Sequence, residues 1–179
     1  YVRQLKQQMS RSVDYDRAPA EDFASVTIEF KTSDGHKVIG EATTSWSFVG
    51  AGLRLSAELL GPEYSLKWNS LDSGLQLFFS RAVKGRAGED LVEKQNAEVG
   101  VMPVVPEEWL AYGYTNEDRH YVRAFLGKEE PRLTFADGVD VVRLLMTAYK
   151  SAEQGKTLRY QPSTLTRFVP KVAKGTWKP

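Results

Sequence analysis

The side chains best suited to binding a small polar molecule gather where the chain enters its first predicted helix. Phenol hydroxyls, a guanidinium group and an imidazole come together there within a short stretch. A polyol is bound by hydroxyl and cationic donors beside an aromatic face, and loops on a rigid scaffold often carry such groups. The same residue types also suit a helix edge that packs on a sheet, so both interpretations stay open. The candidate substrate-binding residues are Tyr112, Tyr114, Arg119, His120 and Trp46.

Several other kinds of chemistry are excluded by residue type. The chain has no cysteine and two histidines, which leaves no thiol nucleophile and too few clustered ligands for zinc or iron. Gly50-Ala51-Gly52 begins a dinucleotide-binding pattern, but Leu55 occupies the position of the third glycine. Gly155-Lys156-Thr157 resembles the end of a P-loop, but it closes a predicted helix instead of opening one. We therefore assign no catalytic residue, no cofactor-binding residue and no metal ligand.

Charge and hydropathy exclude two classes of partner. The chain has 179 residues, and its 24 Lys and Arg are interspersed with 23 Asp and Glu, so no basic face for nucleic acid is expected. No apolar run approaches the ~18 residues of a membrane span, and the first residues do not form a signal peptide. We expect a cytoplasmic protein. Because the sequence starts without Met and inside a strand-like segment, we also expect a fragment of a longer chain.

The elements that position the candidate site are strands in the first half and helices in the second. Apolar and polar residues alternate over short segments separated by turn signals such as Ser33-Asp34-Gly35 and Gly61-Pro62-Glu63. Short turns between successive strands predict antiparallel pairing. The expected strands span residues 23–30, 37–48, 53–59, 64–68 and 75–79.

Two amphipathic helices are expected after the strands. Thr115 is the predicted cap of the first, which ends before Gly127. The second runs from about Ala136 to Gln154, and Gly155 is a natural stop. Its apolar stripe consists of Val141, Leu145, Ala148 and Tyr149.

This order of elements predicts an α+β fold, with an open-faced, mainly antiparallel sheet and helices packed on one face. Trp46, Trp68 and Phe78 do not all fit the inner face, so the other face is either an association surface or is covered by a loop. One domain is expected over residues 1–160, with a long surface loop at 81–100. Residues 161–179 are expected to form an extended tail.

The stretch from Tyr112 to Tyr160 carries a pattern that goes beyond periodicity. A helix with a His-x-Val motif leads into Gly-Lys and a proline, then into Asp-Gly-Val and finally Ala-Tyr-x-Ser-Ala-x-x-Gly-Lys. This pattern resembles the C-terminal signature of the Gfo/Idh/MocA oxidoreductases. The segments 21–24 and 58–61 resemble that family as well. The matching residues are His120, Val122, Ala124, Phe125, Gly127, Lys128, Pro131, Asp137, Gly138, Val139, Val142, Leu145, Ala148, Tyr149, Ser151, Ala152, Gly155 and Lys156.

The resemblance implies a domain that accompanies an N-terminal Rossmann domain in an enzyme that moves a hydride between NAD or NADP and a sugar, polyol or related compound. The chain lacks the Rossmann glycines and the family's Glu-Lys-Pro motif, since Glu93-Lys94-Gln95 has no proline. The resemblance therefore transfers no catalytic residue. It assigns structural roles to Pro131, Gly138, Tyr149 and Ala152.

The function expected from the resemblance is that of a substrate-pocket and oligomerisation domain. The chain alone is expected to be inactive and to bind no cofactor, and to form a homo-oligomer through the open sheet face. One alternative is a stand-alone binding or scaffold domain of the same fold. An unrelated hydrolase or lectin-like module is a further alternative, supported only by the aromatic cluster.

Overall fold

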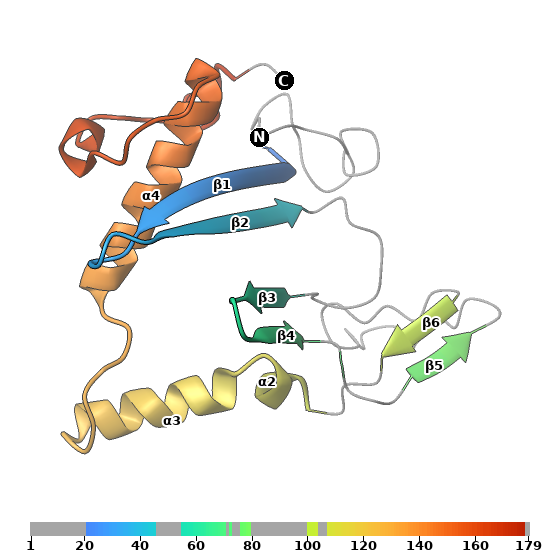
Figure 1. Ribbon diagram of the computed structural model, residues 1–179. Coiled ribbons are helices and arrows are strands. Elements are labelled where there is room, and N and C mark those ends of the chain that lie inside the picture. The colour runs from blue at the N-terminus through green and yellow to red at the C-terminus, as the bar shows by residue number, and fades with distance from the viewer. Residues whose placement is uncertain are drawn as a thin grey trace. The chain divides into compact units, whose positions relative to one another are not determined.

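The protein has an α+β fold in which strands come first and helices last, as the sequence predicts (Figure 1). Trp46 and nearly all of the predicted loop at 81–100 lie outside the part that is described. The computed structural model describes residues 21–45, 55–70, 72, 76–79, 100–103 and 107–177.

The described strands pair antiparallel, in three two-stranded ladders. The first two are the predicted hairpins, whereas the third includes a strand, β6, that begins where the loop was expected to end. A single open-faced sheet stays a prediction. The pairs are β1 (Phe23–Lys31) with β2 (Lys37–Ser45), β3 (Ser56–Leu60) with β4 (Ser65–Asn69), and β5 (Gln76–Phe79) with β6 (Gly100–Pro103).

The register of β3 and β4 separates apolar from polar side chains. Leu59 lies opposite Leu66, and Trp68 lies on the same face two residues further along β4. On the other face Glu58 lies opposite Lys67, a cross-strand pair of opposite charges. This hairpin therefore has one apolar face and one mainly polar face, on which Leu60 lies opposite Ser65. We call them the β3–β4 apolar face and its polar side.

The register of β1 and β2 also places apolar side chains together on one face of the longer hairpin. Val26 lies opposite Ala42, and Phe30 lies opposite Val38, which gives one apolar face. The Phe30 ring lies over Gly40, where an added Cβ would come within 2.9 Å of it. Glycine at this position therefore lets the ring cross the strand pair.

The first helices begin differently from the prediction. The short α2 (Glu108–Ala111) leads into α3 (Tyr114–Phe125) through Gly113, which has φ 89° and caps α3 without a side-chain hydrogen bond. Thr115, the expected cap, lies inside the helix, so that prediction was wrong. The cause is the left-handed glycine, which turns the chain directly into α3 before Thr115 is reached.

The last helix, α4 (Phe135–Gln154), confirms its predicted bounds to within a residue. Asp137 accepts the Thr134 backbone N–H at Oδ2, 2.7 Å away, and the Asp137 N–H donates to Thr134 Oγ1 at 3.4 Å. This reciprocal pair is a capping box. Gly155 ends the helix with φ 60°, as expected for a left-handed glycine stop.

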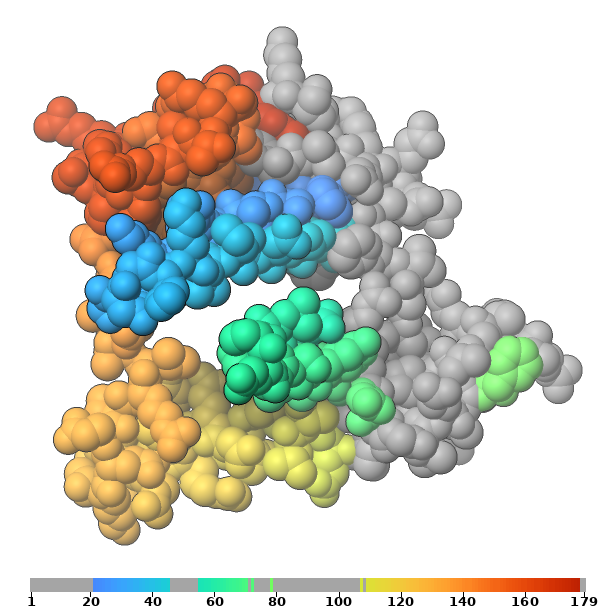
Figure 2. All heavy atoms as spheres, viewed as in Figure 1, coloured from blue at the N-terminus to red at the C-terminus, as the bar shows by residue number. Residues whose placement is uncertain are grey.

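The tail is not simply extended, which corrects the prediction for residues 161–179. It forms a 3₁₀ turn, η1 (Pro162–Leu165), because Pro162 suits the first turn of a helix. It then returns to α4, where the Lys171 N–H donates to Glu153 Oε1 at 2.6 Å. In Figure 2 this tail, in red, lies against α4.

The chain divides into two compact units. One consists of Tyr1–Phe48 together with Leu133–Pro179, and the other of Val49–Arg132. The expected single domain over residues 1–160 stays a prediction. Within the described residues, none of the helices is both long and apolar enough to span a membrane.

Replacing Thr134 with Ala should destabilise the protein by about 1 kcal/mol, because the cap of α4 loses its hydroxyl. Thr134→Ser keeps the hydroxyl and is the matched control.

The stability of this cap should also depend on pH. Hydrogen bonds from the Thr134 backbone N–H first, and then from its hydroxyl, hold the pKa of Asp137 below its ordinary value. The stability that the ionised Asp137 adds to the cap is therefore present at neutral pH. It is lost as pH falls through the lowered pKa. Thermal unfolding followed by circular dichroism measures both effects. Equal melting temperatures for the wild type and Thr134→Ala would contradict the cap.

Candidate functional site

Four of the five predicted substrate residues lie in α3 or in the turn before it, and the three on the helix do not share one side of it. Tyr112 lies half-buried in the turn before the helix, and Tyr114 begins the helix with 53% of its surface exposed. Arg119 is exposed and donates to Asn116 Oδ1 at 3.4 Å. With about 100° per residue, the side chains of Tyr114, Arg119 and His120 point about 100–140° apart around the axis. Their assignment as a joint polyol site stays a prediction.

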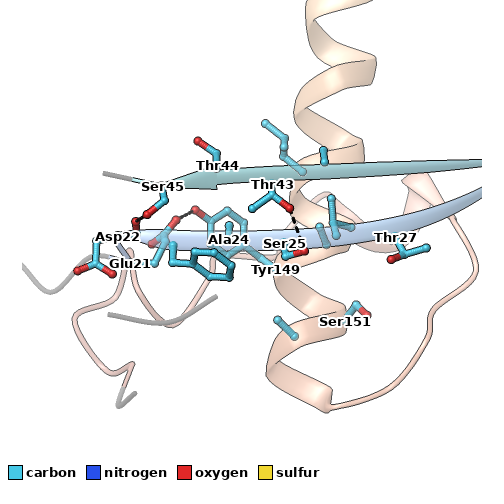
Figure 3. Close-up of a pocket in the computed structure, with 16 residues that line it drawn as sticks. Glu21, Asp22, Ala24, Ser25, Thr27, Thr43, Thr44, Ser45, Tyr149 and Ser151 are labelled. Atoms are coloured by element: carbon cyan, nitrogen blue, oxygen red, sulfur yellow. Dashed lines mark hydrogen bonds between the residues drawn. The ribbon is translucent and has the colours of Figure 1, made fainter. Parts of the chain in front are cut away.

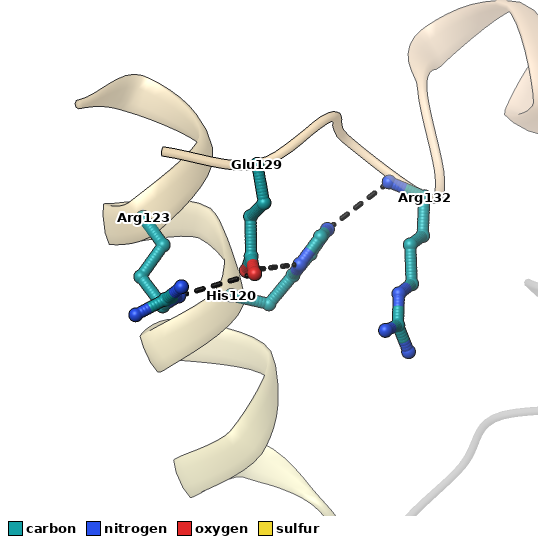
Figure 4. A network of polar contacts seen from close by, with 4 residues as sticks. All are labelled: His120, Arg123, Glu129 and Arg132. Carbon is teal, nitrogen blue, oxygen red and sulfur yellow. Dashed lines mark hydrogen bonds and ion pairs between the residues drawn. The ribbon is translucent and has the colours of Figure 1, made fainter. Parts of the chain in front are cut away.

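His120 is bound at both ring nitrogens by the loop that follows α3 (Figure 4). Nδ1 lies 2.8 Å from Glu129 Oε1, and Nε2 accepts the Arg132 backbone N–H at 3.0 Å. An imidazole nitrogen that accepts an N–H carries no proton, so this geometry places the ring proton on Nδ1, toward Glu129 Oε1. Only 19% of the side chain is exposed. These contacts favour the structural interpretation of His120.

Glu129 connects the loop to α3 through two donors. Arg123 Nε donates to Oε2 at 3.1 Å, and His120 contacts Oε1. Hydrogen bonds from Arg123 first, and then from His120, hold the pKa of Glu129 below its ordinary value. The carboxylate therefore stays ionised and keeps the loop in place.

A hollow of about 450 Å³ lies between the β1–β2 hairpin and α4, inside one compact unit (Figure 3). Its apolar walls consist largely of small side chains, with Ala24 and Ala42 on the hairpin and Ala148 and Ala152 on the helix. Small residues at facing positions leave space that larger side chains would fill. The volume lies within the range of about 300–1,000 Å³ that is typical of small-molecule sites.

Polar groups lie along the same hollow. The Tyr149 hydroxyl donates to the Glu21 carboxylate, and the Ser25 and Thr43 hydroxyls lie 3.3 Å apart. Asp22 is almost fully buried, and its carbonyl accepts the Ser45 hydroxyl at 2.9 Å. Among the described residues that line the hollow, there is no Lys, Arg or His. The described lining therefore carries hydroxyls and carboxylates but no cation.

Comparisons of the chain with protein-family models, with curated proteins and with solved structures gave no match. Within the described residues, no group of three or more His, Asp or Glu side chains is arranged to hold a metal ion.

Sequence reasoning missed the hollow because its walls are far apart in the chain. Tyr149 and Glu21 are separated by 128 positions, and Tyr149 and Ala152 were interpreted as packing residues. The available signal was the pair of alanines at positions 148 and 152 in an otherwise bulky helix stripe. Small side chains at this spacing lie on one helix face. They indicate a place where the helix leaves space beside its packing partner.

Proposed function

We propose that this chain is the substrate-pocket and oligomerisation domain of a cytoplasmic, NAD(P)-dependent oxidoreductase of the Gfo/Idh/MocA type, acting on a sugar, polyol or related compound. A separate Rossmann domain would bind the dinucleotide, and this chain alone would transfer no hydride. The observation that carries the proposal is the residue pattern from Tyr112 to Tyr160. Several of its residues stabilise local structure: Asp137 completes a capping box, Gly155 ends α4, and His120 anchors a loop.

The lining of the hollow supports the substrate half of the proposal. A sugar ring has apolar C–H faces and hydroxyl edges, and the hollow pairs alanine walls with the Tyr149–Glu21 pair and the hydroxyl of Thr44. Because its described lining carries carboxylates and no cation, an uncharged polyol suits it better than a sugar phosphate.

Exposed apolar surface supports the oligomerisation half. Among the described residues, only Asp22, Ser70 and Pro170 are buried, although a chain of this length can enclose a core. On the β3–β4 apolar face, Leu59, Leu66 and Trp68 are 56%, 52% and 46% exposed. Large apolar patches of this kind mark association surfaces.

A stand-alone binding domain of the same fold is the second candidate. It is favoured by the position of the hollow, whose described lining belongs to one compact unit. The mass of the natural gene product separates the two candidates. A product about twice the length of this chain favours the oxidoreductase, because a Rossmann domain adds about 100–200 residues.

Filling the hollow should weaken the binding of a sugar. Ala148→Leu adds three carbons to its wall, so the affinity for glucose, measured by amide NMR titration, should fall at least about tenfold. Val142→Leu adds volume to an exposed position of α4 that does not line the hollow, and it should bind glucose as the wild type does. Glucose 6-phosphate should bind more weakly than glucose. Equal glucose binding by wild type and Ala148→Leu, with helix content preserved, would contradict the site.

Placing a charge on the β3–β4 apolar face should weaken self-association. Stable interfaces bury at least about 1,200 Å² in total, and Leu66→Glu would place a carboxylate inside such a contact. Ser65→Glu adds the same charge to the polar side of the hairpin and is the matched control. Sedimentation equilibrium should show oligomers for wild type and Ser65→Glu, and monomer for Leu66→Glu. A wild-type monomer at tens of micromolar would refute the oligomerisation half.

A further inference from the structure

His120 holds the backbone at the point where the chain passes from one compact unit to the other. Arg132 is the last residue of the unit Val49–Arg132, and Leu133 begins the returning part of the other unit. The Arg132 N–H donates to His120 Nε2 at 3.0 Å. A single side chain on α3 therefore holds the last residue of this unit, two positions before Thr134, the cap of α4.

This hydrogen bond requires a neutral imidazole. Nδ1 already directs its proton to Glu129 Oε1 at 2.8 Å, so a second proton can bind only at Nε2. A protonated Nε2 is a donor and faces another donor, the Arg132 N–H, and two donors cannot share a hydrogen bond. Protonation of His120 therefore removes the acceptor that holds Arg132.

The groups around the imidazole are a carboxylate and two arginines, which keep their charge while the imidazole gains a proton. Glu129 faces Nδ1, Arg123 is bound to the other oxygen of Glu129, and Arg132 supplies the backbone on the Nε2 side (Figure 4). The pKa of Glu129 is lowered, first by Arg123 and then by His120, so the carboxylate remains ionised when the ring gains a proton. Histidine is the side chain that ordinarily changes charge between about pH 5 and 8.

We propose that His120 is a pH-sensitive latch on the connection between α3 and α4. While the ring is uncharged, its Nε2 holds the Arg132 backbone. As pH falls, the ring gains a proton at Nε2, releases the Arg132 N–H and keeps its contact with Glu129. The latch goes beyond the proposed function, because it depends only on contacts within the segment 120–132.

Amide hydrogen exchange of the full chain, measured by NMR from about pH 8 to about pH 5.5, tests the latch. Rates are expressed as protection relative to an unfolded chain, which removes the intrinsic pH dependence of exchange. Protection of the Arg132 amide should be lost in step with the titration of the His120 ring. The Lys128 N–H, which donates to the Arg123 carbonyl at 2.9 Å in the same loop, should keep its protection and is the internal control.

Two histidine variants complete the test. His120→Gln removes the titrating group, so Arg132 should show no pH-dependent step, whatever its level of protection. His36→Gln removes the only other histidine, an exposed residue near Asp34, and should leave the step unchanged. Constant Arg132 protection across the titration of His120 in the wild type would overturn the latch. So would a step that persists in His120→Gln or one that disappears in His36→Gln.

Discussion

Cross-strand pairing decides which side chains of this protein meet and which remain uncovered. In β3 and β4 the register places Leu59 against Leu66 and Glu58 against Lys67, which separates an apolar face from a polar one. A shift of one residue in either strand would mix the two faces. Full burial of a leucine side chain stabilises a protein by about 1.5–3 kcal/mol. Covering the exposed β3–β4 apolar face would therefore be favourable by several such side chains.

The same separation of faces accounts for the hollow in the other unit. The apolar face of the β1–β2 hairpin carries Ala24 and Ala42, and α4 presents Ala148 and Ala152. These side chains are too small to fill the space between hairpin and helix, whose lining also includes Phe23, Leu145, hydroxyls and carboxylates. The apolar stripe of α4 thus leaves room for a hollow where its residues are small.

Local features of the fold could be predicted from the sequence. The bounds of α4 follow from Thr134, Asp137 and Gly155, which act within a few positions of each other. The two hairpins follow from alternation and turn residues in the same way. The start of α3 was predicted wrongly, because the left-handed conformation of Gly113, not a side chain, begins the helix.

Features that depend on distant contacts could not be predicted. His120 stays a predicted substrate ligand, but its partners could not be predicted, because both come from a loop nine and twelve positions away. The Tyr149–Glu21 contact joins segments at opposite ends of the chain. The tail was expected to be extended, but its backbone finds an acceptor on α4. Periodicity specifies the face of an element, whereas these contacts depend on how the elements pack.

We propose that the β3–β4 apolar face is covered by association. Residue-resolved hydrogen exchange at two protein concentrations about a hundredfold apart tests it directly, since association is governed by mass action. The account predicts that the amides of β3 and β4 exchange more slowly at the higher concentration, while those of the exposed first turn of α4 do not change. Identical exchange in β3 and β4 at both concentrations would contradict it.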